Sequence, residues 1–272
     1  MKRLSVIVFV LIINLTFAQT KQFVYEYISI PDSTQNGNFH SEIMVLNIDK
    51  EKSEFFSYRK FVSDSTVNSE IKDGSYYLKP PAPPQKKSEI QIMSGDRVNK
   101  ISNSNQIDFI SRVSESNYLV TQTIDLNWKL HPEYITVLSY KAQKATTEFG
   151  GRKWIAWFTK DIPFQDGPYK FKGLPGLIVK IEDETKSHQF ELRGIKNLNY
   201  DFVYPDNPDN TQIKIPYAKF VKAFKENRKY PAIALKKRFP NAEHAEMIRN
   251  IEKNMLEELK KNNNTIEIDL IK

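Results

Sequence analysis

Alternation of apolar and polar residues dominates the first two thirds of the chain. Because successive side chains of a strand point to opposite faces, this period of two predicts half-buried antiparallel strands. The predicted strands are residues 22–30, 42–49, 53–61, 88–94, 106–113, 118–125, 136–146, 152–159, 176–183 and 188–196. Short polar linkers join the second strand to the third and the ninth to the tenth, which predicts two hairpins.

A helical period appears only near the C-terminus. Residues 216–228 follow a spacing of three and four positions behind a proline, and residues 241–262 carry a longer apolar stripe. Residues 264–271 alternate again, like a closing strand. The chain therefore predicts a mainly β or α+β fold, with a large curved, half-barrel-like antiparallel sheet and one or two C-terminal helices packed on it.

The N-terminus has the pattern of a secretory signal peptide over residues 1–18. Lys2 and Arg3 precede an apolar run that ends in small residues. This run is shorter than the roughly 20 residues that a spanning helix needs. We expect residues 19–272 to form a single exported domain that does not span a membrane, interrupted by a proline-rich surface loop at 79–87, and to reside in the periplasm, at the outer membrane or outside the cell.

The composition of the chain excludes several kinds of chemistry and partner. The chain has no cysteine, so disulfides and thiol nucleophiles are excluded. The formal charge of +7 includes Lys2 and Arg3, which leaves 7 − 2 = +5 for the exported part. Because its cations are interspersed with acids, we expect no nucleic-acid partner. The four histidines are scattered without metal-ligand spacing, so we expect no metal and no cofactor.

No catalytic motif stands out either. The G-x-S-x-G pattern of serine hydrolases is absent. An envelope-associated hydrolase stays open as an alternative, and its site would draw on Arg152, Asp161, Asp166, Glu182 or His188. These residue types can act as acids, bases or charge stabilisers, but only if the fold brings them together.

Aromatic residues gather between positions 149 and 171. On a strand at 152–159, Trp154 lies on one face and Trp157 on the other, so both faces are apolar. Such rings either fill a core or surround an apolar ligand. The candidate binding residues are Arg152, Trp154, Trp157, Tyr169 and Phe171.

The most distinctive stretch is DGPYKFKGLPGLIVKI, residues 166–181. A phosphate-binding glycine loop leads into a helix N-terminus, whereas this one leads into a strand. Pro175 and Gly176 occupy the two central positions that a type II turn favours. We expect a structural turn between strands, built by Gly167, Pro168, Gly173, Leu174, Pro175, Gly176, Leu177 and Ile178.

Residues 142–183 resemble very closely the defining region of the GLPGLI family, exported proteins of Gram-negative bacteria named for the hexapeptide at 173–178. The agreement includes Gly151-Arg152, Gly167-Pro168 and Lys170-Phe171. Members often carry a cysteine before the Lys-Ala pair, where this chain has Ala142. The resemblance implies export, but it brings no catalytic residues because the family has no settled biochemical function.

These observations favour a non-enzymatic binding protein of the periplasm or cell envelope. Its curved sheet would hold an apolar or amphipathic ligand, or an envelope partner such as an outer-membrane protein. A structural accessory of an outer-membrane complex is a further alternative, and it predicts an exposed apolar patch or a long unpaired edge strand.

Overall fold

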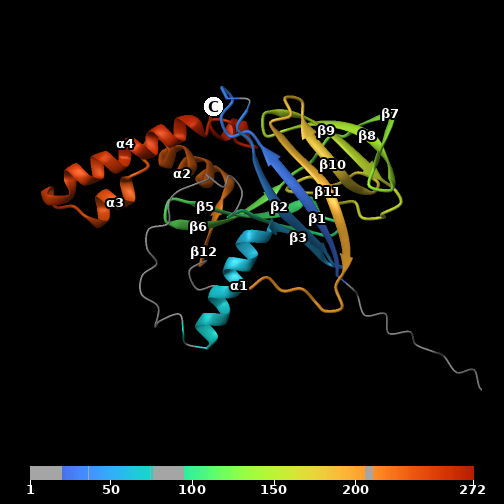
Figure 1. The fold of residues 1–272 in the computed structure, drawn as a ribbon, viewed down its shortest axis with the longest axis horizontal. Coiled ribbons are helices and arrows are strands. Elements are labelled where there is room, and N and C mark those ends of the chain that lie inside the picture. The colour runs from blue at the N-terminus through green and yellow to red at the C-terminus, as the bar shows by residue number, and fades with distance from the viewer. Residues whose placement is uncertain (1–19, 36, 74, 76–94, 206–210) are drawn as a thin grey trace, which may run out of the picture.

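The computed structural model describes residues 20–35, 37–73, 75, 95–205 and 211–272, and within them 12 strands form one sheet (Figure 1). The strands are β1 (Lys21–Ser29), β2 (His40–Ile48), β3 (Lys52–Ser57), β4 (Arg97–Ile101), β5 (Gln106–Val113), β6 (Ser116–Thr123), β7 (Lys129–Val137), β8 (Tyr140–Phe149), β9 (Arg152–Thr159), β10 (Leu177–Asp183), β11 (His188–Asn197) and β12 (Gln212–Pro216). The expected signal peptide, the strand predicted at 88–94 and the proline-rich loop lie outside the described residues.

The sheet has the order β12-β6-β5-β4-β3-β2-β1-β11-β10-β9-β8-β7. Among the described strands the neighbours are antiparallel, except that β12 runs parallel to β6. The predicted hairpins β2–β3 and β10–β11 are present. The prediction of a large, mainly antiparallel sheet is therefore confirmed, although the parallel pair makes the sheet mixed and its edges stay open instead of closing into a barrel.

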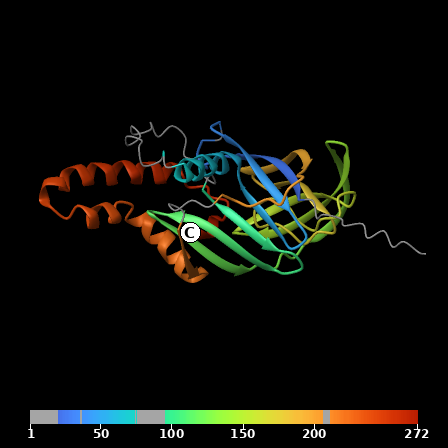
Figure 2. The same cartoon turned by 90° about the horizontal axis from the view of Figure 1, so that it is seen from below.

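The predicted C-terminal helices are also found. Helix α2 spans Tyr217–Lys229, a short α3 spans Ile233–Arg238, and the 3-10 turn Ala242–His244 leads into α4, Ala245–Lys261. Both views show α3 and α4 extending beyond the sheet (Figures 1 and 2). None of the helices in the described ranges has the length and apolar character that crossing a bilayer requires.

The closing strand predicted at 264–271 is wrong. This segment, hereafter the C-terminal segment, is irregular up to a 3-10 turn at Ile268–Leu270. The carbonyls of Asn264 and Thr265 accept hydrogen bonds from the side chains of His188 and Arg152, so side-chain donors take the place of a neighbouring strand. Alternation alone did not reveal this arrangement, because it reports which residues are buried and not what their backbone bonds to.

Helix α1, Tyr58–Lys72, replaces the end of the strand predicted at 53–61. β3 stops at Ser57, whose hydroxyl accepts a hydrogen bond from the N–H of Lys60 and so caps the helix. Within α1 only Asp64 is buried. The helix thus lacks the apolar stripe by which a sequence pattern would have identified it.

The two faces of the sheet bear different layers. The inner face carries Phe55 and Phe109 and packs against residues 160–176, α2 and the C-terminal segment. The outer face carries Phe56, against which the rings of Phe61 in α1 and Phe202 pack. The inner face, where a ligand was predicted to bind, is therefore covered by residues of the chain itself, among them residues 166–178, hereafter the motif.

Gly176 shows why the motif needs glycine. Its φ is +149°, and a Cβ there would lie 2.0 Å from the carbonyl oxygen of Thr159. The N–H of Gly176 donates to Leu174 at 2.8 Å, whereas that of Leu177 donates to Ile162. These bonds describe a three-residue turn around Pro175, not the predicted type II turn, so glycine is required chiefly for the close approach of two backbones.

Gly176→Ala is expected to lower the free energy of unfolding by about 3 kcal/mol or more, because backbone atoms must move to admit the methyl group. Gly194→Ala is the matched control, since a Cβ at Gly194 meets nothing within 4 Å. Urea denaturation of both variants measures the difference. Equal stability of the two proteins would contradict this account of the turn.

Candidate functional site

The structure places three of the five candidate binding residues in the core. Trp154, Tyr169 and Phe171 are at most 1% exposed. The ring centroids of Trp154 and Phe171 lie 4.7 Å apart, and those of Tyr169 and Phe171 6.4 Å. Trp157 lies half-buried on the other face of β9. The three buried rings pack against one another and none is open to a ligand from solvent.

Lys170 connects the motif to the C-terminal segment. Its ammonium lies 2.5 Å from the carboxylate of Glu267 and donates to Gln122 at 2.9 Å. The hydroxyl of Tyr169 donates to the same carboxylate, and burial together with Glu267 holds the pKa of Tyr169 well above its usual value. Because Lys170 and Glu267 are both buried, their pairing offsets the loss of hydration that each charge suffers.

A second ion pair, in which the lysine is buried, fixes the start of the motif to the sheet. Lys100 of β4 lies 2.5 Å from Asp166 and donates to the carbonyl of Gly167 at 2.6 Å. Ser53 of β3 also donates to Asp166. Burial lowers the pKa of Lys100, and the neighbouring carboxylate of Asp166 opposes that shift.

Arg152, the fourth candidate, binds protein groups instead of facing a cavity. It donates to Asp183 at 3.0 Å, to the side chain of Asn264 at 2.5 Å and to the carbonyl of Thr265 at 2.7 Å. Its guanidinium thereby joins the β10–β11 hairpin to the C-terminal segment.

His188 is the neighbour of this cluster. Its Nε2 lies 2.9 Å from the carbonyl of Asn264, which can only accept, so Nε2 carries the proton and Nδ1 accepts from the hydroxyl of Tyr27 at 2.7 Å. Burial, reinforced by the charge of Arg152, lowers the pKa of His188 to about 4. Both ring nitrogens are thus engaged by the protein.

The residues of the hydrolase alternative do not assemble into one site. Arg152 and His188 share the cluster described above, whereas Asp166 pairs with Lys100. Asp161 is exposed, and Glu182 lies 3.6 Å from Lys180. Within the described ranges, no three His, Asp or Glu side chains are arranged to hold a metal ion.

The buried His188 predicts a loss of stability in acid. Its pKa is about 4 in the folded protein and 6.5 in a free side chain, so below pH 6.5 the unfolded chain binds more protons. The free energy of unfolding should fall by about 3 kcal/mol from this residue alone as the pH drops from 6.5 to 4. Because His188→Gln has no titrating group at this position, the excess in free energy of unfolding of the wild type over the variant should shrink by that amount as the pH falls from 6.5 to 4.

Chemical denaturation at a series of pH values measures this difference. Loss of solvation raises the pKa of Asp96 to about 7, which acts with the opposite sign. That contribution is common to both proteins and cancels in the comparison. A wild type and a variant with parallel pH profiles would contradict the assignment.

The Lys170–Glu267 pair gives another prediction. Glu267→Leu leaves a buried ammonium unpaired and should cost about 3–5 kcal/mol, whereas adding Lys170→Met should recover most of the loss. Thermal and urea unfolding of the single and double variants test this. A double variant as unstable as Glu267→Leu would show that the loss of stability does not come from the unpaired ammonium.

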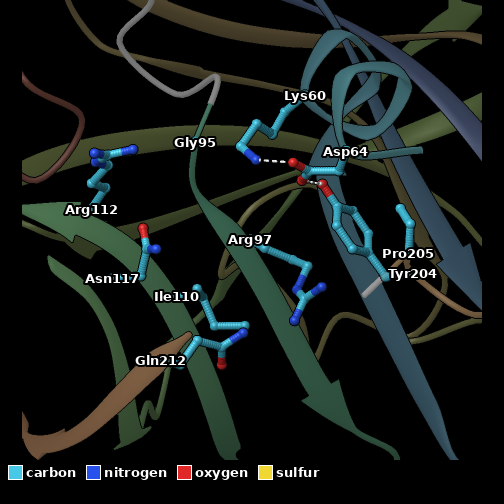
Figure 3. A pocket seen from close by; sticks show the side chains of 10 residues that line it. All are labelled: Lys60, Asp64, Gly95, Arg97, Ile110, Arg112, Asn117, Tyr204, Pro205 and Gln212. Atoms are coloured by element: carbon cyan, nitrogen blue, oxygen red, sulfur yellow. Dashed lines mark hydrogen bonds and ion pairs between the residues drawn. The ribbon is translucent and has the colours of Figure 1, made fainter. Parts of the chain in front are cut away.

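A separate hollow of about 170 Å³ lies on the outer face, between α1, strands β4 to β6 and residues 204–205 (Figure 3). It is lined by Lys60, Asp64, Gly95, Arg97, Ile110, Arg112, Asn117, Tyr204, Pro205 and Gln212. Helix α1 thus contributes a cation and an acid, and adjacent strands contribute two arginines.

Positive charge exceeds negative charge in this hollow. Lys60 pairs with Asp64, which also accepts a hydrogen bond from the hydroxyl of Tyr204 at 2.9 Å. The guanidinium of Arg97 lies 4.3 Å from the centroid of the Tyr204 ring. Its Nε is buried and has no hydrogen-bond partner. Arg97 therefore offers a donor that nothing in the described residues uses.

Sequence reasoning did not find this hollow. Arg97 and Arg112 occupy outward positions of two alternating strands, where charged residues normally face solvent. Lys60 and Asp64 are four positions apart, a spacing that brings two side chains together on one face of a helix. The site could be recognised only once α1 was known.

Comparison with known proteins gives one family match. A family described as "Protein of unknown function (Porph_ging)" matches residues 150–180. The matched residues contain the hexapeptide at 173–178, but the match does not confirm the GLPGLI name and brings no activity. No curated protein matches the chain.

Among solved structures, two crystal forms of PNGF-II are similar to this chain. They show 15% and 14% sequence identity, each with a TM-score of 0.49 over 76% of this chain. The match covers 33% and 32% of the PNGF-II chains, so this protein spans about a third of their length.

Proposed function

We propose that this protein is an exported, non-enzymatic binding protein of the cell envelope that holds a small anionic ligand in the hollow beneath α1. The carrying observation is the buried, unpartnered Nε of Arg97. A buried donor left without an acceptor costs about 1–3 kcal/mol, and an oxyanion is the acceptor that binds a guanidinium most strongly.

The charges around Arg97 support this ligand class. Lys60, Arg97 and Arg112 outnumber the single carboxylate of Asp64. The amides of Asn117 and Gln212 line the same space and can bond to uncharged parts of a ligand. A cavity of about 150 Å³ holds benzene, so the hollow of about 170 Å³ suits a group no larger than one ring.

The inner face supports an apolar ligand less well. Residues 160–176 fill that side, and the aromatic rings expected to bind a ligand are buried among themselves. The signal-peptide pattern supports export, and the dispersal of the candidate catalytic residues supports a binding role. The ligand we propose is anionic instead of apolar.

One observation bears on the alternative of a structural accessory. β7 is an edge strand of nine residues in which Leu130 and Tyr134 are about half exposed. However, it contains Pro132, and its register shifts between Leu130 and Tyr134. Proline and irregular register are the devices by which natural sheets prevent their edges from pairing, so β7 gives this alternative little support.

Calorimetric titration of the purified protein with inorganic phosphate, sulfate and acetate tests the proposal. At least one anion should bind, and Arg97→Gln should weaken that binding about tenfold or more, since a charge-assisted bond is lost. Arg249→Gln, on the exposed surface of α4, is the matched control and should bind like the wild type. Absence of binding by all three anions, or equal weakening in both variants, would reject the site.

A further inference from the structure

Residues 198–205, hereafter the strap, cross the outer face beside the anion hollow. The strap begins where the N–H of Leu198 donates to Thr20 at 2.9 Å. It ends where the Phe202 ring stacks on Phe56, with centroids 5.3 Å apart, and Tyr204 reaches Asp64. Within the described residues, positions 199–205 make no backbone-to-backbone hydrogen bond, so side chains hold this part of the strap.

A row of polar side chains lies on the same face. Asn47 of β2 pairs in register with Glu54 of β3, which pairs with Asn99 of β4. Asn47 is 3% exposed and Glu54 is 7% exposed. Three buried atoms of the row have no hydrogen-bond partner: Nδ2 of Asn47, Oε2 of Glu54 and Oδ1 of Asn99.

The register places this row between the two attachments of the strap. Thr20 precedes Lys21, which pairs with Ile48 next to Asn47. At the other end, the Phe202 ring stacks on Phe56. The side chain of Phe56 points to the same face as that of Glu54, two residues away. Asn99 is likewise two residues from Arg97, so the row continues into the anion hollow.

We infer that the strap covers an extension of the anion hollow and lifts to admit a ligand in which a hydroxyl-rich ring bears an anionic group, such as a sugar phosphate or an acidic sugar. This inference rests on the proposed function. With the Nε of Arg97, the row leaves two donors and two acceptors unmet. Hydroxyl groups donate and accept, so a sugar satisfies both kinds, whereas a simple anion satisfies only the donors.

The structure also explains why the strap is the part that moves. Unmet buried groups disfavour the closed arrangement, and native proteins normally resolve them with a ligand or ordered water. Strands β2 to β4 are held by continuous ladders, whereas the strap beyond Leu198 is held by the rings of Phe202 and Tyr204 and by the hydrogen bond from Tyr204 to Asp64. A ligand that bonds to the row therefore displaces the strap and not the sheet.

The test compares glucose 6-phosphate with inorganic phosphate by calorimetric titration. Glucose 6-phosphate should bind the wild type at least tenfold more tightly than phosphate. In Asn99→Leu this ratio should fall towards one, because a ring hydroxyl loses its partner. Asn250→Leu, on the exposed face of α4, is the matched control and should keep the wild-type ratio. Circular dichroism checks that both variants are folded.

Phe202→Ala provides a second, independent measurement. Removing the ring that holds the strap on Phe56 should strengthen glucose 6-phosphate binding several-fold and leave phosphate binding nearly unchanged. Loss of binding to both probes in this variant would contradict a covering strap.

The possible results separate the two proposals. If both probes bind the wild type equally, the sugar-binding extension is wrong and the anion site stands. If neither binds, the sugar-binding extension is wrong, and the anion site is also wrong unless sulfate or acetate binds. A preference for glucose 6-phosphate that survives in Asn99→Leu places the sugar elsewhere and overturns the inference.

Discussion

The carboxylate of Glu267 is the point on which the inner half of the molecule depends. It accepts hydrogen bonds from the ammonium of Lys170 and the hydroxyl of Tyr169, two consecutive residues of the motif. If either the motif or the C-terminal segment moved away from the inner face, the charges of Lys170 and Glu267 would lose each other as partners. Arg152 repeats this arrangement nearby by binding Asn264 and Thr265. A few buried polar contacts thus connect the centre of the sequence to its end.

The residues that match a known family are distinct from those that line the proposed anion site. The residues that match a known family build the core and its glycine turn, and their side chains are used by the protein itself. The hollow and the strap use residues of the outer face and α1, which lie outside the matched stretch.

Much of the fold could be predicted because alternation reports directly on half-buried strands. β1 and β11 follow it closely, and the apolar stripe identified α4. Helix α1 was missed because it buries a single aspartate, and the C-terminal segment was misassigned because its partners are side chains more than 70 residues away. Trp154 and Phe171 were predicted to bind a ligand but are buried in the core, because an aromatic cluster looks the same in sequence whether it surrounds a ligand or fills a core.

The contacts of the C-terminal segment bear on how the chain reaches its folded state. Asn264 bonds to Ile30 across 234 residues, and Glu267 pairs with Lys170 across 97. Contacts this distant along the chain form late, because the intervening loop must be closed first. During synthesis, Ile30 and Lys170 are therefore made long before their partners Asn264 and Glu267. The contacts that fix the motif on the inner face therefore cannot form until the C-terminal segment has been made.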